Sequence, residues 1–91
     1  MSIKQHLLKC IDIAIRHRQK YVAVLVELPT GNHEVIVFKR DSYADKINYY
    51  DNAYNDELEL KNNPEVKIIN FCCADCLEQV EIDLFEDYIH E

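Results

Sequence analysis

The sequence predicts one α+β domain, in which three helices pack with a three-stranded, mostly antiparallel sheet of strand order 2-1-3. Apolar residues recur at helical spacing in three segments, three further segments are runs of β-forming residues, and capping or turn motifs separate them. Ninety-one residues suffice for one modest core and leave no room for a second. We therefore expect residues 1–91 to form a single domain with the element order α-β-β-α-β-α.

The first third of the chain predicts a helix followed by a β-hairpin. Ser2 and Gln5 have the spacing of a capping box, which satisfies two backbone donors at a helix start. Residues 21–28 are almost continuously apolar, which is typical of a central strand covered on both faces. Residues 29–32, Pro-Thr-Gly-Asn, are typical of a turn, and residues 33–40 predict the second strand.

The middle of the chain predicts a second helix and a loop. Asp41 or Ser42 can cap this helix, whose apolar positions continue at helical spacing to Tyr54. Residues 55–64 are polar and turn-prone, so we expect a loop with at most a short extended piece. A helical crossover between the second and third strands then places the first strand in the middle of the sheet, antiparallel to both neighbours.

The last third predicts the third strand and the third helix. Residues 66–72 form a β-forming run. Asp75 and Glu78 repeat the capping-box spacing and predict a helix that runs almost to the C-terminus.

Charge and apolar content limit the function. The formal net charge is −7, which argues against binding to the nucleic-acid backbone or to anionic lipid. No apolar stretch is long enough to span a membrane, and the first residues do not form a secretory signal. We expect a cytoplasmic protein with reduced cysteines.

Three cysteines cluster where the third strand meets the last helix. Cys73 and Cys76 form a C-x-x-C pair at a helix N-terminus, where the helix dipole can lower a thiol pKa. This junction resembles the active site of the thioredoxin family, which would imply Cys73 and Cys76 as an exchanging pair, although Asp75 between them opposes thiolate formation. Zinc binding by Cys72, Cys73 and Cys76, with Cys10 or a histidine, is a second hypothesis. The third, which we favour, is that reduced cysteines fill apolar space and that the protein has no cofactor.

Catalytic signatures are weak. Glu65-Val66-Lys67 resembles the E-x-K element of restriction-type nucleases, but here a helix and a polar loop precede it. The single glycine, Gly31, excludes a glycine-rich phosphate loop. We expect that the protein is not an enzyme.

An acidic face is predicted on the last helix. Asp75, Asp83, Glu86 and Asp87 fall on its outward side. Such a face is either solvated or a mimic of DNA phosphates.

Apolar residues outside the predicted core indicate an interaction surface. Ile82, Phe85 and Ile89 form a second row on the last helix, displaced from its main apolar stripe, and Tyr49 lies off the stripe of the second helix. A small core cannot bury all of them, and exposed apolar residues of this kind are typical of interfaces. The sequence therefore predicts a non-enzymatic binding module that contacts a protein partner or a second copy. The number of surplus apolar residues favours a homodimer.

A resemblance extends over less than half of the chain. Residues 34–71, with the segments EVIVFKR, DSYADKINYYDNAYNDELEL and VKIINF, look like small proteins encoded by phages and prophages of Gram-positive bacteria. The resemblance implies an accessory or host-interacting role and transfers no site residue.

Overall fold

The computed structural model describes residues 2–89, with side chains described as far as Leu84. The elements follow the order α-β-β-α-β-β-α. They are α1 (Ile3–Arg16), β1 (Tyr21–Glu27), β2 (His33–Lys39), a 3-10 turn (Arg40–Ser42), α2 (Tyr43–Ala53), β3 (Glu59–Leu60), β4 (Asn63–Ala74) and α3 (Leu77–Ile89).

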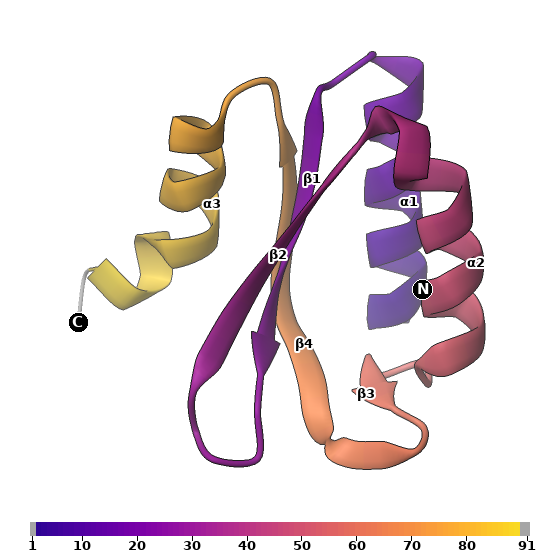
Figure 1. The fold of residues 1–91 in the computed structure, drawn as a ribbon, viewed down its shortest axis with the longest axis vertical. Helices are drawn as coiled ribbons and strands as arrows, with labels where there is room; N and C mark the ends of the chain where they lie inside the picture. The colour runs from indigo at the N-terminus through magenta and orange to yellow at the C-terminus, as the bar shows by residue number, and fades with distance from the viewer. Residues whose placement is uncertain (1, 90–91) are drawn as a thin grey trace.

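The strands form one antiparallel sheet of order β2-β1-β4-β3 (Figure 1). The predicted order of the three longer strands, with β1 between the other two, is confirmed. The prediction of three strands is wrong because a fourth, β3, pairs with the beginning of β4. The sheet is also antiparallel at every pairing, where the sequence predicted a mostly antiparallel one.

The segment predicted as a loop is folded around Asn55. Its Oδ1 accepts hydrogen bonds from the backbone N–H groups of Glu57 and Glu59, at 2.9 and 3.0 Å. Leu58 adopts a positive φ of 60° and is fully buried. These contacts turn the chain into β3, and β4 then starts at Asn63, earlier than the sequence predicted. Pro64 is tolerated there because β1 pairs with β4 only from Lys67 onward.

Helices cover the two faces of the sheet unequally, as Figure 1 shows. α1 and α2 lie on one face, and α3 lies alone on the other. Because side chains alternate along a strand, Val22, Val24 and Val26 of β1 pack toward α1 and α2, whereas Ala23 and Leu25 pack toward α3. The prediction that this strand is buried on both faces is confirmed.

The helix starts agree only in part with the capping motifs. Ser2 and Gln5 form the predicted capping box of α1. Neither Asp41 nor Ser42 caps α2 through its side chain, because the 3-10 turn leads the chain directly into the helix. α3 begins at Leu77, and the Asp75 carboxylate accepts a hydrogen bond from the Lys20 backbone N–H, at 3.3 Å.

Among residues 2–89, no helix is both long and apolar enough to cross a bilayer.

Candidate interaction surface

The face of β2 that looks toward α3 is apolar and open. Val35 is paired with Leu25, and Val37 with Ala23, in the register of β1 and β2. Leu25 and Ala23 are completely buried, whereas Val35 and Val37 are 38% and 40% exposed. The buried residues of β1 and the exposed residues of β2 are therefore separated by only one strand spacing, about 4.8 Å.

Contacts from β4 hold α3 away from β2. The Asn70 Nδ2 donates to the backbone oxygens of Asp83 and Leu84, at 3.4 and 3.1 Å. The Cys72 thiol lies 3.9 Å from the backbone oxygen of Val80. With Val80 and Leu84 buried against β1 and β4, α3 covers these two strands and leaves β2 open.

Leu77 is a further exposed apolar residue, in the first turn of α3. It is 52% exposed. At 100° per residue along the helix, Leu77 and Asp83 lie on opposite sides of the buried Val80. The side that carries Asp83 is the one near Cys72 of β4. Leu77 therefore lies on the flank turned toward β1 and β2, at the end of the sheet where Tyr21 and Lys39 are paired.

Some backbone groups of β2 also face away from β1, along the outer edge of the sheet. The Leu28 N–H donates to the Asn32 oxygen at 2.9 Å and closes the hairpin, with Gly31 at a φ of 88°. Because hydrogen-bonded and non-hydrogen-bonded pairs alternate along an antiparallel ladder, Val35 and Val37 direct their N–H and C=O groups away from β1. We call this edge, together with Val35 and Val37, the β2 surface.

The predicted interface residues do not come together. Tyr49 is 48% exposed on α2, and Ile82 is 53% exposed on α3, so the sheet separates them. Ile82 lies on the side of α3 opposite Val80 and Leu84. The Tyr49 ring packs against those of Tyr50 and Tyr54, with centroids 5.2 and 6.1 Å away. The side chains of Phe85 and Ile89, also predicted there, lie outside the described residues.

The predicted acidic face is only partly described. Asp75 is exposed and bonded to the Lys20 N–H, while Asp83 is half-buried and accepts a hydrogen bond from Gln79 at 2.8 Å. The side chains of Glu86 and Asp87 lie outside the described residues. The two described carboxylates each have a donor within the fold.

The cysteines lie in three different environments. Cys73 packs with the core beneath α1 and α2, next to Cys10, whereas Cys72 packs beneath α3 and Cys76 is exposed. Burial raises the pKa of the Cys10 thiol, and likewise that of Cys72, to about 12. Within the described part of the chain, no three Cys, His, Asp or Glu side chains are placed to hold a metal ion. This geometry gives no support to the zinc hypothesis, because adjacent strand residues point to opposite faces.

The E-x-K residues lie in the ladder of β4. Lys67 is paired with Glu27 of β1 and with Glu59 of β3, and Glu65 is exposed. The position of Lys67 opposite two glutamates agrees with a structural role for this lysine.

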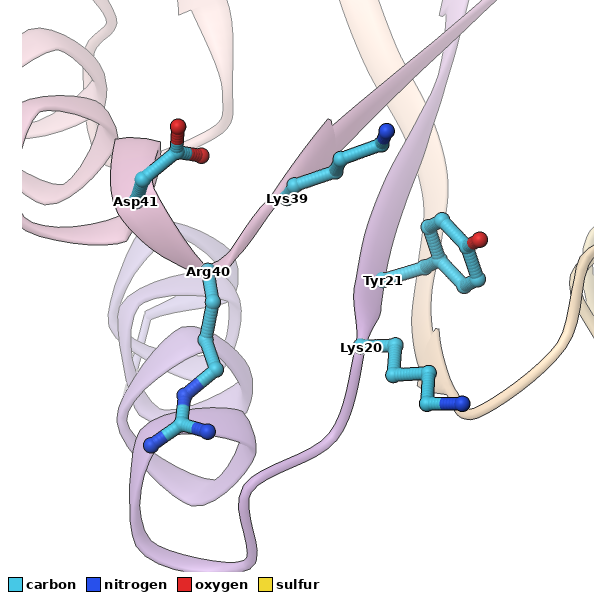
Figure 2. A pocket seen from close by; sticks show the side chains of 5 residues that line it. All are labelled: Lys20, Tyr21, Lys39, Arg40 and Asp41. Carbon is cyan, nitrogen blue, oxygen red and sulfur yellow. The ribbon is translucent and has the colours of Figure 1, made fainter.

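A hollow of about 380 Å³ lies at the end of the sheet where β1 begins and β2 ends. Lys20, Tyr21, Lys39, Arg40 and Asp41 line it. In Figure 2, Lys20, Tyr21 and Lys39 extend to one side, while Arg40 and Asp41 point in other directions. The residues that line the hollow are mostly positively charged, but their side chains do not point toward one another.

The sequence contained a signal for the β2 surface that the interface prediction did not use. Residues 35–38, Val-Ile-Val-Phe, are apolar at four successive positions, so both faces of this strand are apolar. A strand at the edge of the predicted sheet needs cover on both faces to bury such a run. The structure covers Phe38 and leaves Val35 and Val37 exposed.

No family model, curated protein or solved structure matches this chain.

Proposed function

We propose that this chain is a non-enzymatic protein-interaction module, and that the β2 surface is where it binds an extended strand of a protein partner. The observation that carries the proposal is that β2 exposes both backbone groups and apolar side chains. Its backbone donors and acceptors face outward at Val35 and Val37, and the side chains of these residues are about two-fifths exposed.

Strand addition uses both of these features. Main-chain hydrogen bonds to a sheet edge supply affinity, and side chains on alternate positions supply specificity. β2 offers seven residues without a register shift, which is long enough for this mode. An accessory or host-interacting role, which the resemblance to phage-type proteins implies, agrees with such a binding surface.

Site-specific photo-crosslinking tests the proposal. A benzoylphenylalanine residue replaces Val37 in one variant and Ile82 in a matched control, and both are irradiated in the cells that express them. We expect covalent adducts with protein from position 37 and at least fivefold fewer from position 82, because Ile82 is apolar and even more exposed than Val37 but lies on α3, away from the edge. Equal yields at the two positions, or none at position 37, would contradict the proposed surface.

A further inference from the structure

We infer that the strand bound at the β2 surface is β2 of a second copy, in an antiparallel register centred on Ile36. The inference rests on the proposed function and names its partner. It would join two sheets of four strands into one continuous sheet across a two-fold axis.

The edge lacks several of the features that normally prevent such pairing, and its charged residues Glu34 and Lys39 lie toward the two ends of the strand. Sheet edges are protected by proline, bulges, very short strands or covering elements. β2 contains no proline and pairs with β1 without a register shift, and no helix or loop of residues 2–89 lies over its outer edge in Figure 1. At the opposite edge, β3 is only two residues long and its register shifts, which are two of these protective features.

Symmetry then restricts the register. A two-fold axis perpendicular to the sheet keeps each face continuous, so paired residue numbers must have an even sum. Centring on Ile36 pairs all seven residues from His33 to Lys39 and sets Val35 opposite the second copy's Val37. Both of these residues direct their backbone groups outward, as a hydrogen-bonded pair requires.

The side chains and charges are complementary in this register. The two copies' exposed valines meet on the face beside α3, with Cβ atoms of opposed residues about 5 Å apart. Glu34 lies at the start of β2, and Lys39 and Arg40 lie at its end. Antiparallel pairing brings Glu34 near the second copy's Arg40 at the basic hollow, whereas parallel pairing would align like charges.

Sedimentation velocity of the full chain between 1 and 200 µM tests for the dimer. We expect a concentration-dependent dimer whose dissociation constant rises at least tenfold in Val37→Lys, because the substitution places two ammonium groups in the valine cluster. The matched control, Ile82→Lys, adds the same charge on the far side of α3 and should leave the constant within twofold. Circular dichroism checks that both variants are folded. A wild-type chain that stays monomeric throughout overturns the inference, and so does a dimer equally sensitive to both substitutions.

A disulfide test fixes the register without relying on loss of binding. Ile36→Cys in a Cys76→Ser background should form a disulfide-linked dimer with oxidised glutathione, since Ile36 then lies opposite the second copy's Ile36. The parent Cys76→Ser protein should not form it. Absence of the linked dimer overturns the register. If position 37 crosslinks only to other proteins, the proposed function stands and the second-copy inference fails.

Discussion

The two faces of the sheet differ in how completely they are covered. Under α1 and α2 the core includes large buried side chains such as Leu7, Ile11 and Tyr43, whereas under α3 it consists of Ala23, Leu25, Ala74, Val80 and Leu84. Two helices span the first face, and one helix spans part of the second. Most of the large core side chains therefore lie under α1 and α2, and the exposed apolar strand residues Val35 and Val37 lie on the face beside α3.

Removing a large side chain from the well-covered face should have the largest effect. Leu7 is completely buried, so we expect Leu7→Ala to lower the free energy of unfolding by about 3–5 kcal/mol. Urea denaturation followed by circular dichroism measures this change. A loss under 1 kcal/mol would show that the two faces do not differ in the way described.

The matched substitution on the other face is Leu84→Ala. Leu84 is also completely buried, but a single helix can settle onto a half-covered face, so we expect a loss of about 2–3 kcal/mol. Hydrogen exchange should show α3 amides opening at a lower free energy than those of β1. If the amides of α3 and β1 exchange together in this variant, α3 is not an independent unit.

Alkaline pH should weaken the first face more than the second. Burial raises the pKa of Cys10 and Tyr54 to about 12, and it also raises that of Tyr50; all three lie on the side of α1 and α2. On the α3 side, burial raises the pKa of Cys72 to about 12. Because the folded-state values exceed the unfolded ones of 9.0 for cysteine and 10.0 for tyrosine, their stabilising effect is complete below pH 9 and is lost as the pH rises toward 12.

Denaturation midpoints at pH 7, 9 and 10.5 measure this loss. We expect the midpoint to fall between pH 9 and 10.5, and Cys10→Ala to flatten the fall. Cys72→Ala is the matched variant on the second face. A midpoint that stays constant up to pH 10.5 would contradict the raised pKa values.

The smallest effect is expected from one hydroxyl group. The Tyr43 O–H donates to the Gln19 backbone oxygen at 2.9 Å and joins the start of α2 to the connection between α1 and β1. Tyr43→Phe leaves that acceptor without this donor, so we expect a loss of about 1 kcal/mol. Tyr21→Phe is the control, because no hydrogen bond of its hydroxyl is seen among the described residues and its stability should change by under about 0.5 kcal/mol.

Much of the fold could be predicted from local patterns. The Ser2 capping box, the Pro29–Asn32 turn and the apolar run of β1 each depend on residues that are close in sequence. The short strand β3 could not be predicted, because it depends on Asn55 bonding and on pairing with β4. A two-residue strand carries no periodicity of its own.

The sequence predicted that an interaction surface exists, but it did not predict which residues form the candidate surface. Surplus apolar residues indicated an interaction surface, and the prediction placed it on Tyr49 and the row beginning at Ile82. The structure puts these two residues on opposite sides of the sheet, and it shows Val35 and Val37 exposed side by side on β2. Whether a residue is covered depends on which helix docks above it.

The sequence by itself determined the helices, the long strands and the central place of β1, because capping, turn chemistry and periodicity act over a few residues. Only the tertiary structure decided that α3 lies alone on its face and stops short of β2. That outcome depends on contacts such as those of Asn70 with the Asp83 and Leu84 backbone, and on the burial of Leu84 against β1, far away in the chain. No local sequence pattern predicts where on a sheet a helix packs.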